Sequence, residues 1–213
     1  MTNKIIGIQG DKLDKINISS DTSIFLAHEA QKLGYKIFYY TPSNLSIIKN
    51  KTYANGVFVK LNYERKKFYK IYKKQKIDVE NFKFILIRQD PPFNSEYLIT
   101  TLILDNLKKT RVINNPVAIR NVSEKLYSKK FTKYMPDTIF SNNIDEIRKF
   151  FNKNKNMIMK PINGYGGNQI HLIKNKFNKK LIKNFLKKNG HSMFQKFLKN
   201  ISKSCLLYTS HIQ

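Results

Sequence analysis

The first 40 residues restrict the fold more than any other stretch, because they alternate a strand, a helix and a second strand. Lys4–Gln9 and Tyr35–Tyr40 are apolar runs of strand length. Between them, apolar residues recur at helical spacing over Ile24–Leu33, residues 19–21 offer N-cap side chains, and Gly34 occupies the position of a C-terminal glycine. A strand–helix–strand unit of this length joins parallel strands. The stretch therefore predicts an α/β fold with a parallel sheet.

The rest of the chain continues this alternation and forms a second unit. Strand patterns occupy Val57–Leu61, Phe82–Arg88, Arg111–Ile113, Asp137–Ser141 and Ser192–Phe197. Helical patterns occupy Ser95–Leu107, Ser123–Ser128, residues 142–151 and Lys180–Lys188. The pattern breaks at Asn114–Pro116, and the first unit ends near Arg120. We expect one domain over residues 1–120 and a second over residues 121–203.

The net charge of +26 would suit a nucleic-acid-binding protein, but the residue types argue against that interpretation. Only five of the 40 basic residues are Arg and the other 35 are Lys, whereas base and phosphate recognition favours Arg. Lysine is also abundant in every segment, together with Asn and Ile. We interpret most of this charge as solvated surface, so nucleic acid is not the expected partner.

Several functional classes are excluded by composition. The 41% hydrophobic content describes a globular protein, and no apolar run approaches the ~20 residues of a membrane span. The N-terminus has too short an apolar core for a signal peptide, so we expect a cytoplasmic location without membrane association. Cys205 is the only cysteine and the four histidines are scattered, so no internal disulfide and no Cys/His metal site are predicted.

The stretch Asn156–Leu172 carries the clearest chemical signal. Met157–Met159 is a short apolar strand that Lys160 closes, three glycines fall within residues 164–167, and a strand pattern then resumes. A glycine-rich tip allows several backbone N–H groups to approach one anion, and a lysine at its base adds positive charge. The alternative is an ordinary hairpin whose glycines serve only the geometry of the turn.

A second stretch, Lys66–Lys76, interleaves aromatic residues with lysines. This pattern allows a stacking platform for single-stranded nucleic acid. It fits better an edge strand or helix whose lysines lie along apolar surface with their amines in water.

A third stretch, Arg88–Pro92, follows a strongly apolar strand with a charged turn. The carboxyl ends of parallel strands are where α/β sheets bind ligands, so Arg88 and Asp90 are candidate substrate-binding residues. The alternative is an ion pair between them at the surface.

Taken together, several stretches resemble prokaryotic glutathione synthetases, which are ATP-grasp ligases. The matching residues keep their order and spacing across residues 4–200. They are Ile16–Ile18, Asp21–Phe25, Ala30–Tyr35, Ile85–Phe93, Asn114–Pro116, Arg120, Glu124–Leu126, Met159–Pro161, Gly164–Gly167, Gln195 and Phe197–Leu198. The Arg-x-Asp-Pro-Pro-Phe motif ending at Phe93 favours this family over other ATP-grasp ligases. Two positions depart from the family pattern: Gln89 replaces a usual Lys, and Asn163 replaces a usual Asp.

The resemblance implies a Rossmann-like pre-ATP-grasp domain followed by the first subdomain of an ATP-grasp fold. It implies ligation of γ-glutamylcysteine and glycine through an acyl phosphate, with ATP and Mg²⁺, in a homo-oligomer. Arg88 and Asp90 would contact the peptide substrate, and no catalytic residue is assigned. The implied nucleotide-binding residues are Lys125, Lys160, Gly164, Tyr165, Gly166, Gly167, Gln195, Phe197 and Leu198.

The metal ligands and the end of the chain depart from this expectation. Mg²⁺ requires oxygen ligands, mainly carboxylates, and no Asp or Glu follows Glu146. We expect the metal ligands in a C-terminal part that this chain lacks, and residues 204–213 form an atypical tail. A fragment of this kind is expected to be inactive alone. The competing hypothesis is a small basic nucleic-acid-binding protein built on Lys66–Lys76.

Overall fold

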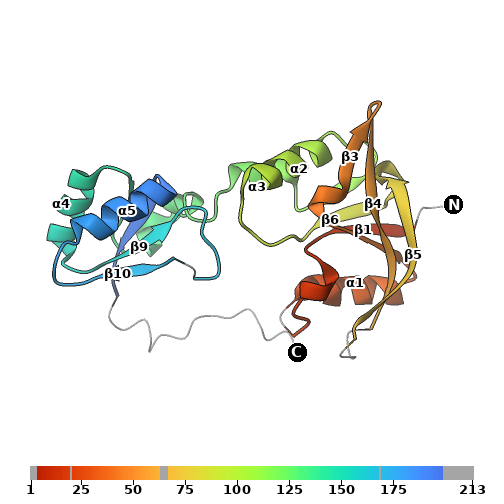
Figure 1. Cartoon of the computed structure of the whole chain (residues 1–213), viewed down its shortest axis with the longest axis horizontal. Helices are drawn as coiled ribbons and strands as arrows, with labels where there is room; N and C mark the ends of the chain where they lie inside the picture. Colours follow the sequence, from red (N-terminus) through yellow and green to blue (C-terminus); the bar gives the residue numbers. More distant parts are fainter. Residues whose placement is uncertain (1–3, 20, 63–66, 168, 199–213) are drawn as a thin grey trace. The chain divides into compact units, whose positions relative to one another are not determined.

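The computed structural model describes residues 4–19, 21–62, 67–167 and 169–198. The chain forms two compact units, Met1–Val122 and Ser123–Gln213 (Figure 1). Each unit has its own core, and each is described by itself. The predicted tail at 204–213 lies outside the described residues.

The first unit is built on a sheet whose centre is parallel. Seven strands are present in its described part, in the order β3-β4-β2-β1-β6-β7, with β5 paired to β4. Their bounds are Ile5–Gln9 (β1), Lys36–Tyr40 (β2), Leu45–Ile48 (β3), Lys51–Leu61 (β4), Tyr69–Asp78 (β5), Phe84–Ile87 (β6) and Arg111–Ile113 (β7). Strand β1 pairs in parallel with both β2 and β6, and β6 pairs in parallel with β7. The predicted parallel sheet is confirmed.

Helices cover both faces of this sheet. They are α1 (Thr22–Lys32), α2 (Ser95–Asp105) and α3 (Pro116–Asn121), with short 3-10 turns at Leu13–Lys15, Pro42–Asn44 and Val79–Asn81. Helix α1 buries Ile24 and Ala27 in one core, and α2 places Leu104 in the core on the opposite face. The Asp21 side chain caps α1 by accepting hydrogen bonds from two backbone N–H groups, as its position in the sequence predicts.

The strands at the β5 side of the sheet are longer than the sequence pattern indicates. The pattern predicts a strand only over Val57–Leu61, whereas β4 begins at Lys51 and pairs with β3, which the pattern misses. The first half of β4 buries Thr52 and Ala54, which are small or polar and give little apolar signal. Of the predicted edge strand or helix at Lys66–Lys76, the edge strand is confirmed from Tyr69 onward, since β4 is the only strand partner of β5 in the described chain, and Lys66 lies outside the described residues.

The second unit holds an antiparallel sheet with two helices on one face (Figure 1). The strand order is β10-β9-β11-β8. The bounds are Thr138–Ser141 (β8), Met157–Pro161 (β9), His171–Ile173 (β10), Ser192–Lys196 (β11), Ile144–Asn154 (α4) and Lys179–Asn189 (α5). The two helices bury Ile147 and Ile182 against Met159 and Phe194 of the sheet. The opposite face of the sheet carries Lys160.

One predicted helix is wrong. Residues Ser123–Ser128 do not form an α-helix, and a 3-10 segment begins only at Tyr127 and runs to Tyr134. No side chain caps the start of this segment, and the Ser128 hydroxyl donates to the carbonyl of Lys125. A serine that bonds to the backbone three residues earlier competes with the regular helical pattern.

We expect the adjacent tyrosines of β2 to differ in their effect on stability. The Tyr39 hydroxyl donates to the carbonyl of Asp11 at 2.7 Å, whereas the Tyr40 hydroxyl is buried without a partner among the described residues. A buried hydroxyl without a partner costs about 1–3 kcal/mol. Tyr40→Phe should therefore leave the free energy of unfolding unchanged or raise it by about 1 kcal/mol. Tyr39→Phe should lower it by a similar amount. Chemical denaturation measures both, and a clear loss on Tyr40→Phe would contradict the prediction.

Glu80 provides a pH-dependent contribution to stability. Its carboxylate accepts backbone N–H groups of Lys108, Lys109 and Thr110 at 2.7–2.9 Å. Burial raises the pKa of Glu80, but these hydrogen bonds lower it by more. The net pKa is therefore below its usual 4.5. A depressed carboxyl pKa gives stability that is present above about 4.5 and is lost as the pH falls toward the folded pKa.

Glu80→Gln should lower the free energy of unfolding by about 1–2 kcal/mol at pH 7 and make its decline below pH 4.5 shallower. Denaturation between pH 3 and pH 7 measures both effects. Glu29→Gln is the matched control, because Glu29 contacts only its α1 neighbours Lys32, at 2.8 Å, and His28, at 3.7 Å, among the described residues, and exposed helix pairs contribute about 0.3–0.5 kcal/mol. An equal effect of the two substitutions would contradict the role of Glu80.

Candidate functional site

The glycine-rich hairpin of the second unit has the predicted form. Strands β9 and β10 pair antiparallel, with Met159 opposite His171, and the loop between them carries the glycines. Gly166 and Gly167 have φ of 58° and 74°, which favour glycine. A Cβ on Gly164 would lie 2.4 Å from the Pro161 ring, so the loop could not approach the end of β9 with a larger residue there.

Two lysines lie beside this loop. The Lys125 ammonium donates a hydrogen bond to the carbonyl of Gly164, and the Lys160 ammonium donates to Gln195 Oε1 at 3.0 Å. Burial lowers the pKa of Lys160, and the charge of Lys125 lowers it further. Exposed Glu124 lies 3.3 Å from Lys125, and none of the described carboxylates pairs with Lys160. Two neighbouring cations of this kind favour a bound anion.

Thr138 is a site residue that the sequence reasoning missed. The Gln195 side chain bridges two strands, because its Oε1 accepts from Lys160 while its Nε2 donates to Thr138 Oγ1 at 3.0 Å. The chain of hydrogen bonds therefore crosses β9, β11 and β8. These residues are 35 and 57 positions apart in sequence, so only the strand order could have revealed the contact.

The predicted adenine-side residues follow directly after β11. The Phe197 backbone N–H donates to the carbonyl of Asn156 at 3.2 Å, and the Lys174 ammonium lies 5.6 Å from the centre of the Phe197 ring. Leu198 and Tyr165 are 43% and 40% exposed, so both are accessible to a ligand. Their nucleotide-binding role stays a prediction.

Arg88 and Asp90 lie at the carboxyl edge of the parallel sheet in the first unit. The Arg88 guanidinium does not pair with Asp90 as a simple surface ion pair would. It donates from Nε to Ser23 Oγ at 2.9 Å and from Nη2 to Thr22 Oγ1 at 2.7 Å. Since a guanidinium carries five N–H donors, three remain after these two bonds. The hydroxyls of the first turn of α1, which the sequence reasoning missed, thus fix Arg88 in place.

Carboxylates surround the same sheet edge. The Asp90 backbone N–H donates to Asp11 Oδ2 at 2.8 Å. Burial raises the pKa of Asp90, and Asp11 and Asp21 raise it further, while Arg88 opposes them. The edge therefore presents both signs of charge, which suits a ligand that carries an ammonium and a carboxylate.

A neutral pair lies beneath this edge. The Gln9 side-chain amide donates to Gln89 Oε1, and both side chains are buried. Gln9 Oε1 has no partner of its own in the described chain. Gln89, which replaces the usual Lys of the family motif, therefore contributes an amide and no charge here.

The described residues do not fit a magnesium site. Within residues 4–19, 21–62, 67–167 and 169–198, no group of three His, Cys, Asp or Glu side chains is placed to hold a metal ion. In the second unit, Asp137 pairs with Lys153 at 2.8 Å and Glu146 accepts from Ser141. We therefore assign no chemical step to a metal ion.

Comparison with known proteins identifies the family. The profile described as prokaryotic glutathione synthetase, N-terminal domain, matches residues 5–120, and the profile described as prokaryotic glutathione synthetase, ATP-grasp domain, matches residues 124–205. The chain belongs to the prokaryotic glutathione synthetase family. This confirms the resemblance and the α/β fold with a partial ATP-grasp domain. No described helix of this family member is long and apolar enough to cross a membrane.

Individual relatives agree with this assignment. The glutathione synthetase of Buchnera aphidicola subsp. Acyrthosiphon pisum is 36% identical over 171 residues, which cover 79% of this chain and 53% of the relative. That of Wigglesworthia glossinidia brevipalpis is 34% identical over 201 residues, which cover 92% of this chain and 63% of the relative. The chain thus spans about half the length of the first of these and less than two thirds of the second.

Solved structures support the fold alone. The D-cycloserine synthetase DcsG aligns with a TM-score of 0.61 at 13% identity, covering 92% of this chain and 60% of that one. The D-alanyl-alanine synthetase A of Vibrio cholerae aligns with a TM-score of 0.55 at 13% identity, covering 92% and 60%.

Removal of the Lys160 ammonium should weaken nucleotide binding. Because Lys160 is half-buried beside Lys125, Lys160→Ala should reduce ATP affinity by about 1–3 kcal/mol, the scale of a lost hydrogen bond to a charged group. Titration calorimetry measures the change. Lys153→Ala is the matched control, because Lys153 is exposed on α4 and already pairs with Asp137. Unchanged affinity for Lys160→Ala, or equal losses for both variants, would remove Lys160 from the nucleotide site.

Proposed function

We propose that the chain carries the peptide-binding and nucleotide-binding parts of a glutathione synthase, which joins γ-glutamylcysteine to glycine and consumes ATP. The observation that carries this proposal is the lysine pair beside a glycine hairpin in a chain of this family. The mixed-charge edge around Arg88 supports it from the first unit. A homo-oligomer and a cytoplasmic location remain predictions.

In the proposed reaction, an oxygen of the cysteinyl carboxylate attacks the γ-phosphorus of ATP, and ADP leaves. The amine of glycine then attacks the acyl carbon. Phosphate leaves with the electron pair of the broken C–O bond, and the new amide nitrogen releases a proton. Both steps form or remove charge on phosphate oxygens, so positioning and fixed positive charge supply the catalysis.

The second unit would hold the nucleotide. Lys125 and Lys160 provide positive charge for the phosphate oxygens, and Gln195 keeps the Lys160 amine in place through its bond to Thr138. The loop at 164–167 offers backbone N–H groups and covers the phosphates. Coverage matters because water would hydrolyse the acyl phosphate before glycine reacts.

The first unit would hold the γ-glutamyl group. This group carries one α-carboxylate and one α-ammonium, so it requires donors and acceptors close together. Arg88 has three N–H donors left for the carboxylate, and its position is fixed by Thr22 and Ser23. Asp11 and Asp90 provide carboxylate oxygens at the same edge for the ammonium.

A binding experiment with the chain tests this assignment. Titration calorimetry should detect binding of γ-glutamylcysteine, and Arg88→Ala should weaken it by about 1.5–3 kcal/mol while leaving ATP affinity unchanged. Arg148→Ala is the matched control, because the Arg148 guanidinium stacks on Phe177 at 4.4 Å in the second unit. D-Alanine serves as the competing substrate class. Binding of D-alanine without binding of γ-glutamylcysteine, or equal losses for both arginine variants, would contradict the proposal.

A further inference from the structure

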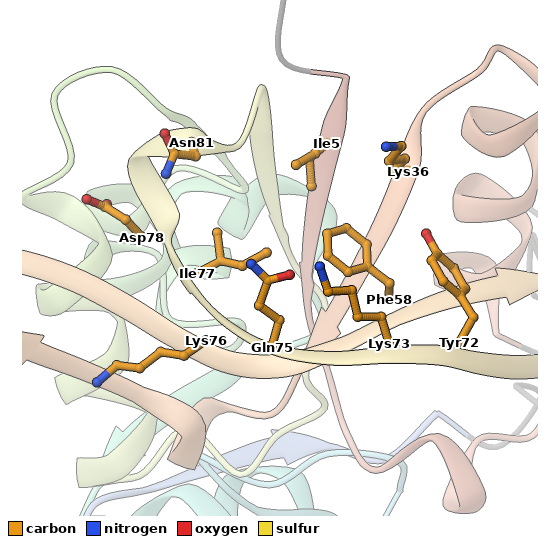
Figure 2. Close-up of a pocket in the computed structure, with 10 residues that line it drawn as sticks. All are labelled: Ile5, Lys36, Phe58, Tyr72, Lys73, Gln75, Lys76, Ile77, Asp78 and Asn81. Atoms are coloured by element: carbon orange, nitrogen blue, oxygen red, sulfur yellow. The ribbon is translucent and has the colours of Figure 1, made fainter.

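A groove beside β5 in the first unit takes no part in the proposed reaction. It has a volume of about 440 Å³ and lies on the face of the sheet that α2 covers elsewhere (Figure 2). Its walls come from the starts of β1 and β2, at Ile5 and Lys36, and from the paired strands β4 and β5. The groove therefore opens at the amino edge of the parallel strands, away from Arg88.

A β-bulge builds the aromatic floor of this groove. The pairing of β4 with β5 shifts by one residue between Phe58 and Val59, so that Tyr72 is the extra residue on β5. Such a bulge changes the direction of a side chain and is common beside binding sites. Here Tyr72 stacks on Phe58, with the ring centres 5.8 Å apart and the planes at 29°, and remains 55% exposed (Figure 2).

The strand beneath this floor is held close to the sheet. A Cβ on Gly56 would lie 2.4 Å from the carbonyl oxygen of Tyr39 and 2.7 Å from the Phe38 ring. Gly56 pairs with Gln75, whose exposed amide lines the groove. The floor is therefore a packed part of the sheet, and its exposed aromatic ring is preformed for a flat partner.

Lysines line this face without neutralising partners. Lys36 and Lys73 line the groove, and Lys60 and Lys70 lie directly opposite each other next to it. One carboxylate, Asp78, also lines the groove, but it lies 3.9 Å from the Lys51 ammonium, and none of the four lysines has an ion-pair partner among the described residues. Like charges at opposite positions destabilise a sheet. An anion placed over the pair would relieve that repulsion. Lys76 takes no part, since its ammonium lies 4.9 Å from the Tyr53 ring and extends away from the groove (Figure 2).

We propose that this groove binds single-stranded nucleic acid without sequence preference, with a base stacked on Tyr72 and backbone phosphates against Lys36, Lys60, Lys70 and Lys73. Base stacking on an exposed aromatic ring together with lysine contacts to the backbone is the chemistry of such sites. Lysine suffices because phosphate contacts carry no sequence information. Strand β5 is ten residues long, so the charged face extends beyond one nucleotide and favours a polymer.

This proposal differs from one based on total charge. Lysine is abundant throughout the chain, so a basic surface alone identifies nothing. The groove adds a bulged, stacked and exposed tyrosine, and a like-charged pair in register, at one place. The two explanations predict different effects for lysines placed elsewhere, and a charge-matched comparison separates them.

The test uses the full chain and a fluorescein-labelled oligouridylate of about 12 nucleotides, followed by fluorescence anisotropy. Lys60→Gln, Lys70→Gln and Lys73→Gln together should weaken binding at least tenfold. The slope of the logarithm of the binding constant against the logarithm of the salt concentration should change from about −3 toward zero. Each phosphate contact contributes about −0.7 to this slope for single strands. The matched control replaces three exposed lysines of α5, Lys180, Lys183 and Lys187, with Gln, which removes the same charge.

The aromatic part has its own variants. Tyr72→Ala should weaken oligouridylate binding about tenfold and Tyr72→Phe should restore it, whereas Tyr134→Ala, at a side chain that is 80% exposed, should have no effect. Circular dichroism confirms that each variant is folded. Equal losses for the β5 and α5 triple variants would overturn the proposal in favour of total charge. Uridine monophosphate binding as tight as that of the oligonucleotide would overturn the assignment to a polymer.

Discussion

The parallel pairing of β1 with both β2 and β6 is the constraint on which the first unit depends. It brings the carboxyl ends of these strands to one edge, and it fixes where the chain must turn into α1. Arg88 leaves the end of β6 there, and its guanidinium binds the hydroxyls of Thr22 and Ser23 in the first turn of α1. A residue from the middle of the chain is therefore oriented by two residues near its beginning. No local feature of the stretch around Arg88 could produce this arrangement.

The second unit positions its candidate site residues with an antiparallel sheet. Helices α4 and α5 cover one face and bury its apolar side chains, so polar residues of the same strands must point to the other face. Alternation along β9 places Met159 in the core and Lys160 opposite to it. Strand β9 thus contributes both to the core that stabilises the sheet and, through Lys160, to the positive charge that would hold phosphate. Gln195 and Thr138 follow the same alternation on their own strands, which is why the three can form one chain of hydrogen bonds.

Local features of the fold were predictable from the sequence, and non-local ones were not. The cap of α1 depends on neighbouring residues, and the pattern narrowed it to residues 19–21, of which Asp21 is the cap. Strand β3 and the start of β4 were missed, because Thr52 and Ala54 fill a core without a clear apolar signal. Lys160 was indicated by the strand and glycine pattern and Gln195 by the resemblance to a family, but the hydrogen bonds from Lys160 to Gln195 and from Gln195 to Thr138 required the strand order. In this chain, the identity of a residue was easier to predict than the partner that orients it.

The two proposed ligand sites of the first unit lie at opposite ends of the same short strands. Strand β1 begins with Ile5 in the groove and ends with Gln9 beneath the Arg88 edge, four residues or about 13 Å later. Between them the strands are buried on both faces, so no side chain of one site reaches the other. A ligand over Tyr72 and a peptide beside Arg88 would therefore occupy the unit independently. The electrostatic field of the groove lysines could still act over this distance. Salt screens that field within about 8–10 Å.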